Sequence, residues 1–378
     1  MFLLEFEGKK LFKEFKIPVP DSDIATNVNE VLEIAERIGY PVVIKPQIPG
    51  GRRGRAGAIR FANDPSEAKK HAEELFKMTL YGHKVERVLV EKKINIAHEY
   101  YLSFLIDFES RSPVLLFSPM GGIEVEELAR KYPEKLIKHY IDGLELHDFE
   151  IRNLLIKAGI RGKKLRIFSN IIHALWNCFK NKELMLAEIN PLAEDTNGNI
   201  WALDARVVID ENAEFRQPWI TEIKKNRAGW EAMEIEAKNK GISFVVLAGR
   251  GIGTIVNGAG LAMATCDVVK KFGGEVANFL DIGGGAGAER VITAMQMLQR
   301  LGCDAILINI FGGITRCDVV AQGLVEALQK IKIEKPIVVR LTGTREEEGK
   351  QILEKASLKA YTDMIEAIKK AVELSKKH

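Results

Sequence analysis

The chain has 378 residues, a 46% hydrophobic share and a formal net charge of +3. Its length predicts two or three domains, each large enough to bury its own core. The basic residues are spread along the sequence, so the charge gives no reason to expect a nucleic-acid or membrane partner. No stretch approaches the ~18 uncharged residues of a membrane span. The four cysteines lack CxxC spacing, and we expect reduced thiols in a cytoplasmic protein.

The first half of the chain mixes helical and strand patterns. Residues 1–15 predict an amphipathic helix rather than a signal peptide, since Glu5 and Glu7 interrupt a short apolar run. Farther along, helices are expected at 28–39 and 64–78, and strands at 40–47, 54–62, 85–93, 99–107, 184–194 and 199–210. The strands come as hairpins rather than in strict alternation with helices, which indicates an α+β domain.

Glycine usage changes near residue 240. From there on, apolar strands that end in glycine alternate with helical segments, as in FVVLAG, GTIVNGAG, EVANFLDIGGG, DAILINIFGG and PIVVRLTG. This pattern predicts a doubly wound parallel sheet with helices on both faces and ligands at the carboxyl ends of its strands. The polar helical segment 221–241 is a candidate connection. We therefore expect an α/β protein of two domains, an α+β domain over residues 1–238 and a doubly wound parallel-sheet domain over residues 239–378.

Basic residues near the start of the first domain suggest an anion site. Lys45 stands inside the apolar strand VVIKPQ, where a lysine is costly unless it meets an anion. Taken alone, an edge-strand or salt-bridged lysine explains it as well. In the glycine- and arginine-rich loop 50–57, small residues let backbone N–H groups approach phosphate oxygens, and the arginines add charge. The alternative for that loop is a solvated turn.

Acidic and amide side chains at later strand ends suggest a ribose and a metal site. Glu91 ends a strand and Glu99 follows shortly after it, so either carboxylate is placed to accept from ribose hydroxyls, although most exposed glutamates do not. Asn190 and Asp204 lie on a predicted hairpin and offer two oxygen ligands to Mg²⁺. Glu188 shares a face with Asn190 by strand alternation. A turn-capping Asn and a structural Asp are the alternative.

Together these features resemble the ATP-grasp nucleotide-binding fold. Over nearly its whole length the chain is similar to the β subunits of succinyl-CoA synthetase (succinate–CoA ligase). The matching stretches are GRAG (54–57), FRQP (215–218), NGAGLAMATCD (257–267), ANFLDIGGGA (277–286) and NIFGGITRCD (309–318). The resemblance implies an ATP-grasp domain followed by a flavodoxin-like CoA-ligase domain.

The resemblance also implies roles for particular residues. A nucleotide, ATP/ADP or GTP/GDP, would be held by Lys45, Arg52, Arg53, Gly54, Glu91, Ile94 and Glu99. Asn190 and Asp204 would bind Mg²⁺, and Glu188 would contact a loop that carries a catalytic phosphohistidine. The implied reaction converts succinate, CoA and nucleoside triphosphate reversibly to succinyl-CoA, nucleoside diphosphate and phosphate, a step of the tricarboxylic acid cycle.

A second anion site is indicated in the last third. The segment 311–315 ends an apolar strand and leads into a helix, whose first N–H groups and positive dipole end favour an anion. An ordinary turn with glycines for close packing is the alternative. The resemblance implies that the anion is the phosphate of the phosphohistidine. Asn257, Gly313, Ile314 and Thr315 would then line the adjoining pocket for the acid.

None of the seven histidines lies in a glycine-rich loop. Members of the family carry the phosphorylated histidine, and the CoA site, on a separate α subunit. We therefore expect this chain to act only within a heteromer.

Other functions remain as alternatives. Gly258, Gly260 and Asp281 are spaced as in a dinucleotide-binding fold, but Met263 replaces the third glycine and several other glycine loops follow. A non-catalytic nucleotide-binding regulatory subunit would need neither the Asn190–Asp204 pair nor the helix start. A related ligase such as malate–CoA ligase fits the same residues. The sequence leaves open ATP or GTP, succinate or malate, and an αβ or α₂β₂ assembly.

Overall fold

The computed structural model describes residues 1–48, 57–227 and 229–377. Its contacts divide the chain into two compact units, Met1–Glu222 and Ile223–His378. Within the segment expected to connect the domains, helix α8 (Gly229–Asn239) buries Met233 and Ala237 in the core of the second unit. Its packing therefore assigns α8 to that unit, and the domain boundary near 238 stays a prediction. No helix in the described ranges is long and apolar enough to cross a membrane.

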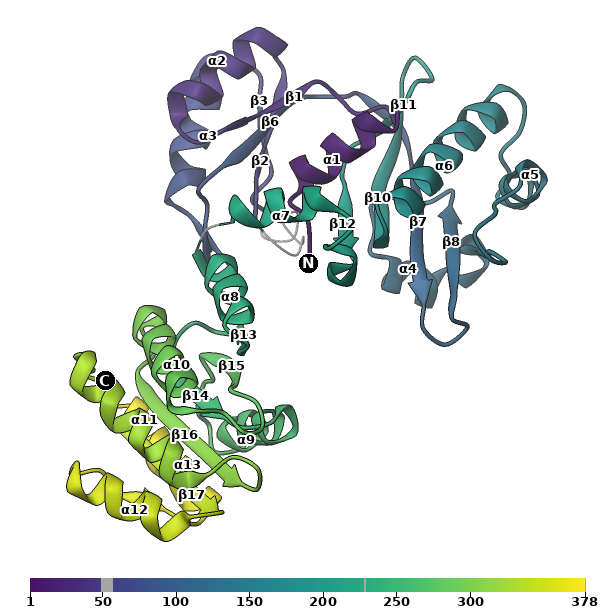
Figure 1. Cartoon of the computed structure of the whole chain (residues 1–378). Coiled ribbons are helices and arrows are strands. Elements are labelled where there is room, and N and C mark those ends of the chain that lie inside the picture. The colour runs from purple at the N-terminus through teal and green to yellow at the C-terminus, as the bar shows by residue number, and fades with distance from the viewer. Residues whose placement is uncertain (49–56, 228, 378) are drawn as a thin grey trace. The chain divides into compact units, whose positions relative to one another are not determined.

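The smaller sheet of the first unit is antiparallel and has the strand order β1-β6-β2-β3. Its strands are β1 (Ser22–Ala25), β6 (Val88–Lys92), β2 (Val42–Pro46) and β3 (Arg60–Ala62). Helices α2 (Val28–Ile38) and α3 (Pro65–Lys77) pack against this sheet (Figure 1). Val42 and Ile44 are buried with these helices, so strand alternation turns Val43 and Lys45 to the opposite face.

The larger sheet of the first unit has the order β11-β10-β7-β8-β9, and β12 also pairs with β10. Its strands are β11 (Ile200–Ala202), β10 (Leu184–Asp195), β7 (Ile96–Asp107), β8 (Ser112–Ser118), β9 (Ile137–Tyr140) and β12 (Arg206–Ile209). Helix α6 (Lys163–Asn181) packs along β7 and β10 (Figure 1). Aromatic rings join the two layers, with Phe168 of α6 edge-on to Tyr100 and Trp176 beside Phe104.

The predicted strand 199–210 is two strands in the structure. Along β10, Leu192 stands opposite Ala202 of β11 and Glu188 opposite Arg206 of β12. Residues 203–205 join these two strands and belong to neither, so Asp204 does not lie on a strand as predicted. The break coincides with an irregularity in β10, whose register with β7 shifts between Ile189 and Leu192.

Shorter elements complete the first unit. The predicted N-terminal helix is α1 (Glu5–Glu14), in which Phe12 is fully buried. The others are β4 (Thr79–Leu80), β5 (His83–Lys84), α4 (Val125–Lys131), η1 (Pro133–Lys135), α5 (Asp148–Lys157), η2 (Glu211–Ala213) and α7 (Pro218–Lys225), which crosses into the second unit. The predicted strand 54–62 begins only at Arg60, and residues 54–56 lie outside the described ranges.

The sheet of the second unit has the order β13-β15-β14-β16-β17-β18. Its strands are β13 (Ser243–Val246), β15 (Asn278–Asp281), β14 (Ile252–Val256), β16 (Ala305–Gly312), β17 (Ile337–Gly343) and β18 (Ala360–Tyr361). The predicted parallel sheet is confirmed, except that β13 pairs antiparallel with β15. The loop 247–251 after β13 is too short for the crossover of roughly a dozen residues that a parallel neighbour requires.

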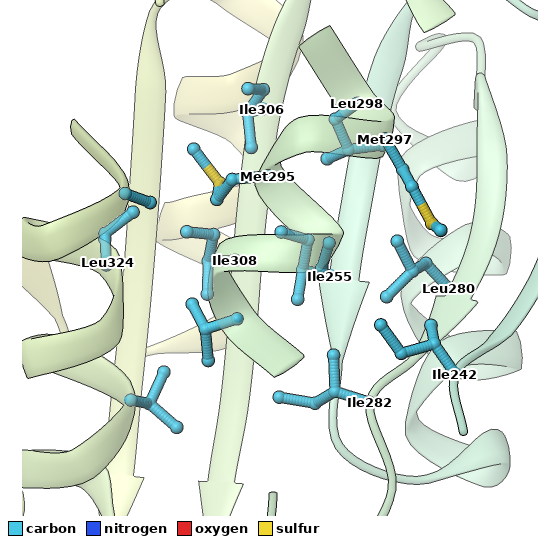
Figure 2. Close-up of a cluster of buried hydrophobic side chains, with 14 of the residues drawn as sticks. Ile242, Ile255, Leu280, Ile282, Met295, Met297, Leu298, Ile306, Ile308 and Leu324 are labelled. Atoms are coloured by element: carbon cyan, nitrogen blue, oxygen red, sulfur yellow. The ribbon is translucent and has the colours of Figure 1, made fainter. Parts of the chain in front are cut away.

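Helices cover both faces of this sheet, as predicted. One face carries α9 (Ala259–Lys271) and α13 (Met364–Ser375), and the other carries α8, α10 (Ala288–Leu301), α11 (Cys317–Lys330) and α12 (Glu346–Lys355). Figure 2 shows the second face, where Met295 and Leu298 of α10 lie over Ile308 and Ile255 of the central strands. Alternation sends Leu307 of β16 to the first face.

Candidate functional site

A cavity of about 860 Å³ lies in the first unit. It is lined by both sheets, by the N-terminal segment with α1, and by the loop that follows β8. The structure brings most of the predicted nucleotide and metal residues together here: Lys45, Glu91, Ile94, Glu99, Glu188, Asn190 and Asp204 all line this cavity. Arg52, Arg53 and Gly54 lie outside the described residues.

Lys45 is salt-bridged within the wall of the cavity. Its Nζ lies 2.8 Å from Glu91 Oε1 and 3.0 Å from Glu5 Oε1, and it donates to the Leu203 carbonyl oxygen over 2.7 Å. Burial opposes the charged form of this lysine, but the carboxylates of Glu5, Glu91 and Asp204 outweigh burial and raise its pKa. Lys45 therefore enters the cavity as a fully charged donor.

A second lysine, Lys9 of α1, joins the same cluster. Its Nζ is 2.9 Å from Glu5 Oε1 and from the Leu203 carbonyl oxygen, and it also contacts Glu91 Oε2. Glu5, Lys9 and Glu91 are each only 2% exposed. Sequence reasoning missed Glu5 and Lys9 as site residues. The signal was their i,i+4 spacing, which places an ion pair on the same helix face as the apolar Phe12.

Glu91 and Glu99, both predicted to bind ribose, have different surroundings. The two carboxylate oxygens of Glu91 contact Lys45 and Lys9, so the ribose role of Glu91 stays a prediction. Glu99 is half-buried and lies beside the loop after β8. A Cβ on Gly122 would come within 2.1 Å of Glu99 Oε2, and Gly121 N donates to the Glu99 carbonyl oxygen over 2.9 Å. The glycine pair after an apolar strand was the signal for this loop, which the sequence prediction did not use.

Asn190 and Asp204 lie where β10 changes partners. Asn190 Oδ1 accepts from the N–H of Gly122 over 2.9 Å, and Asn190 Nδ2 donates to the Ile123 carbonyl oxygen over 2.8 Å. The N–H of Leu203 donates to the carbonyl oxygen of Pro191 over 3.1 Å, which brings Asp204 beside Asn190 along the cavity wall. An amide oxygen and a carboxylate are ligands that Mg²⁺ prefers, with waters and phosphate oxygens filling the remaining positions. These donors fit the predicted metal.

The donor set also explains why a metal would need the nucleotide. Among the described residues, no group of three or more His, Cys, Asp or Glu side chains is arranged to hold a metal ion. Mg²⁺ usually keeps one or two protein ligands and shares the rest with phosphates and water. Two side-chain oxygens at Asn190 and Asp204 match that pattern.

Glu188 is the most buried acid on the β10 side of the cavity, at 8% exposure. Tyr101 donates its hydroxyl hydrogen to Glu188 Oε2 over 3.0 Å, and Arg206 Nη1 lies 3.9 Å from Oε1. Burial raises the pKa of the Glu188 carboxyl despite the opposing charge of Arg206. Glu188 and Asn190 both line the cavity, as their spacing along one strand predicts. The carboxylate is oriented and able to accept or hold a proton.

The predicted acid site lies at the carboxyl ends of the strands in the second unit. Asn257 Nδ2 donates to the Phe311 carbonyl oxygen over 2.8 Å, and Phe311 N donates back to Asn257 Oδ1 over 2.9 Å. Gly285 N donates to Thr315 Oγ1 over 3.0 Å. Thr315 is buried, while Gly313 and Ile314 are exposed. These bonds join the ends of β14, β15 and β16 at one edge of the sheet.

The contacts of Asp281 argue against the dinucleotide alternative. Its Oδ1 accepts from the N–H groups of Gly258 over 2.6 Å and of Gly283 over 2.7 Å. An acid that binds ribose must present its oxygens to the ligand, whereas this carboxylate stabilises two glycine turns of the protein itself.

Other groups of the protein already interact with the first residues of α11. Cys317 N donates to the Thr344 carbonyl oxygen over 2.9 Å, and Arg316 forms a two-pronged ion pair with Asp318 in the first turn. Cys317 is fully buried, and burial raises the pKa of its thiol. Cys317 therefore packs as a small buried side chain in the core of the second unit.

Two family profiles cover most of the chain. That of the ATP-grasp domain matches residues 2–194, and that of the CoA-ligase domain matches residues 255–375. The second match contains the whole predicted acid site, and the first contains the residues that line the cavity from Phe2 to Pro191.

Known proteins similar to the chain agree with these profiles. The β subunits of ADP-forming succinate–CoA ligase from Staphylothermus marinus and Ignicoccus hospitalis are each 44% identical over all of this chain and 99% and 100% of their own lengths. The β subunit of GDP-forming succinate–CoA ligase from Thermus thermophilus is 41% identical over 98% of both chains. ATP citrate lyase from Methanothrix soehngenii, solved with citrate and coenzyme A, has a TM-score of 0.71 at 20% identity, covering 98% of this chain and 99% of its own. That likeness shows the shared fold.

Proposed function

Because the chain belongs to the family of succinate–CoA ligase β subunits, we propose that it is the nucleotide-binding subunit of an acid–CoA ligase. With an α subunit it would convert succinate, CoA and nucleoside triphosphate reversibly to succinyl-CoA, nucleoside diphosphate and phosphate. The observation that carries the proposal is the single cavity lined by Lys45, Glu99, Glu188, Asn190 and Asp204. A regulatory subunit that only senses nucleotide would not require the Asn190–Asp204 pair.

In the first unit, the chain's residues position the nucleotide and a nucleophile that arrives from outside. Lys45 would donate to a nucleotide phosphate, and Asn190 and Asp204 would hold Mg²⁺. When bound, Mg²⁺ neutralises negative charge on the phosphates during transfer. Glu188, oriented by Tyr101, accepts a hydrogen bond from one imidazole nitrogen of the incoming histidine. The other nitrogen is then free to take the phosphoryl group.

The histidine itself is proposed to come from the α subunit. The cavity lining contains no histidine among the described residues, while phosphoryl transfer through a phosphohistidine needs one. The second site, at Asn257 and residues 313–315, would receive the phosphohistidine and the acid. Gly313 and Ile314 are exposed residues, so an anion can reach this turn. Free thiols at all four cysteines agree with a cytoplasmic location.

The experiment that tests the proposal uses the complex. We would co-express the chain with the α subunit from the same source and assay purified complex with ATP or GTP and with succinate or malate. We expect succinyl-CoA and ADP to form only when both subunits, Mg²⁺, CoA and succinate are present. A folded heteromer that binds Mg-nucleotide but ligates malate would move the assignment to a malate–CoA ligase. A folded heteromer that forms no acyl-CoA with any acid would overturn it.

A further inference from the structure

We propose that Lys9 is a positioning residue of the nucleotide site, a permanent counter-charge for Glu5 and Glu91 that allows Lys45 to leave these carboxylates and bind a nucleotide phosphate. The inference rests on the proposed function, since it concerns how the same cavity accepts a nucleotide. It adds a residue of α1, far from the other site residues in the sequence, to the nucleotide machinery.

The geometry shows two ammonium groups that contact the same three residues, at two shared acceptor atoms and at the two oxygens of one carboxylate. Lys9 and Lys45 each lie within 3.0 Å of Glu5 Oε1, at 2.9 and 3.0 Å. Each donates to the Leu203 carbonyl oxygen, over 2.9 and 2.7 Å. Each also contacts one oxygen of Glu91, Lys45 at Oε1 and Lys9 at Oε2. Within this cluster, two positive charges balance two negative charges.

The two lysines differ in their access to the cavity. Lys45 lines it and keeps 10% of its side chain exposed. The Lys9 side chain is 2% exposed, and Lys9 is not among the described residues that line the cavity. A ligand in the cavity therefore meets Lys45 but not Lys9. This asymmetry assigns the mobile role to Lys45 and the permanent role to Lys9.

The electrostatics explain why a second lysine is needed. If Lys45 were the sole cation among these carboxylates, each phosphate contact would take it from two buried acids and leave them uncompensated, which is strongly unfavourable. With Lys9 in contact with both carboxylates, Lys45 can turn to the phosphate while Glu5 and Glu91 keep a partner. Lys9 thus weakens the competition between protein and nucleotide for Lys45.

Lys9 also supports the predicted metal ligand. The Leu203 carbonyl oxygen accepts from Lys9, the Leu203 N–H donates to Pro191, and Asp204 is the next residue. The buried cluster therefore holds the segment that carries Asp204 from one side, and β10 holds it from the other. Loss of Lys9 should therefore weaken nucleotide binding, because it disturbs both Lys45 and the segment that carries Asp204.

The test compares substitutions on α1 in the complex of the full chain with its α subunit, using calorimetric titration with Mg-ADP. Lys9→Met keeps the volume of the side chain but removes the charge. We expect it to raise the Kd roughly 10- to 100-fold, the range for a lost charge-assisted contact, and to raise the KM for nucleotide more than it lowers kcat. Lys9→Arg should restore most of the affinity. Lys10→Met, on the exposed face of the same helix, is the matched control and should bind as the wild type does.

A double variant separates positioning from a structural role. The charged groups that contact Lys9 are Glu5 on α1 and Glu91 on β6, and Lys45 on β2 contacts the same two carboxylates. In Lys9→Met/Glu5→Gln, one of the two carboxylates that lost a cation is removed as well, so the affinity for Mg-ADP should return towards wild type. A merely structural lysine would leave the double variant as weak as Lys9→Met alone, and that result would overturn the proposal.

A second variant keeps the proposal testable if Lys9→Met does not fold. In Glu5→Gln one competing carboxylate is lost while Lys9 still contacts Glu91, so Mg-ADP should bind as tightly as in the wild type or more tightly. Clear weakening by Glu5→Gln would contradict the proposed competition. Wild-type complex that fails to bind Mg-ADP would instead contradict the proposed function, whereas equal binding by wild type and Lys9→Met would overturn only the inference about Lys9.

Discussion

The side-chain amide of Asn190 is hydrogen-bonded to the backbone of Gly122, whose N–H donates to Asn190 Oδ1 over 2.9 Å. The amide nitrogen of Asn190 holds the next residue through the Ile123 carbonyl oxygen. A residue predicted as a metal ligand is therefore also the anchor of the loop after β8. Because an amide oxygen has two lone pairs, the Gly122 contact leaves one for a metal.

Comparing Gly122→Ala with a control glycine should distinguish the effect of backbone strain from the effect of displacing Glu99. Gly122 has φ +73°, and an added Cβ would lie 2.1 Å from Glu99 Oε2, so both backbone strain and displacement of Glu99 are expected. Gly143→Ala is the matched control, since Gly143 has φ +63° with open space around a Cβ. Each variant should lose about 1–2 kcal/mol of unfolding free energy from the left-handed backbone alone. Only Gly122→Ala should also weaken Mg-ADP binding; equal binding by both variants would argue against a nucleotide role for Glu99.

Under the proposed function, Asp204→Ala should remove Mg²⁺-dependent phosphorylation of a histidine on the α subunit while the heteromer stays assembled. If Asp204 is a direct ligand, as proposed, its loss should weaken metal binding by more than the ~10- to 100-fold that follows the loss of an outer-shell partner. The measurement is phosphohistidine formation from labelled nucleotide as a function of Mg²⁺ concentration. Asp210→Ala, at the start of η2 and away from the cavity lining, is the control. Normal phosphorylation by Asp204→Ala would exclude the metal role.

Glu188→Gln should change how stability depends on pH. Burial holds the pKa of Glu188 above its ordinary value of 4.5, so the folded protein binds this proton more tightly than the unfolded chain. The stabilisation that this tighter proton binding gives the folded protein is fully present at pH values below the ordinary pKa of the carboxyl. It is lost as pH rises through the raised pKa of the folded protein. Gln does not titrate, so the variant does not lose this stabilisation. As pH rises, the unfolding free energy of the wild type should therefore fall relative to that of Glu188→Gln.

Urea unfolding of the chain at several pH values between about 4 and 8 measures this difference. Glu109→Gln removes an exposed glutamate and should follow the wild-type trend. If the gap between Glu188→Gln and wild type stays constant over this range, the carboxyl of Glu188 does not titrate differently in the folded protein.

Thr315→Val should test the acid site in the second unit. The variant keeps the shape of a buried side chain but loses the hydroxyl that accepts from Gly285 N over 3.0 Å. The expected loss of stability is about 0.5–1.5 kcal/mol, and the loosened turn should raise the KM for the acid without changing the Kd for Mg-ADP. Thr315→Ser retains the hydroxyl and should preserve the KM. A change in nucleotide affinity instead would contradict the separation of the two sites.

Much of the fold could be predicted because its patterns are local. The N-terminal helix, the hairpin strands of the first unit and the glycine-terminated strands of the second are each encoded by neighbouring residues. The pairing of β13 could not be read in the same way: its apolar sequence suits either direction, and only the short loop 247–251 and the place of β15 in the sheet decide it. The break at Asp204 likewise depends on where β10 exchanges β12 for β11.

By itself, the sequence determined which side chains were chemically suited to a nucleotide site, among them Lys45, Asn190 and Asp204, because strand ends and residue types are visible along the chain. Only the tertiary structure decided that Lys9 would share the partners of Lys45. The contact of Lys9 with Leu203 joins residues 194 positions apart, and helical periodicity reports only which residues share a face of one element. What that face meets is settled when α1 packs between the two sheets, where a buried charge must find its counter-charge.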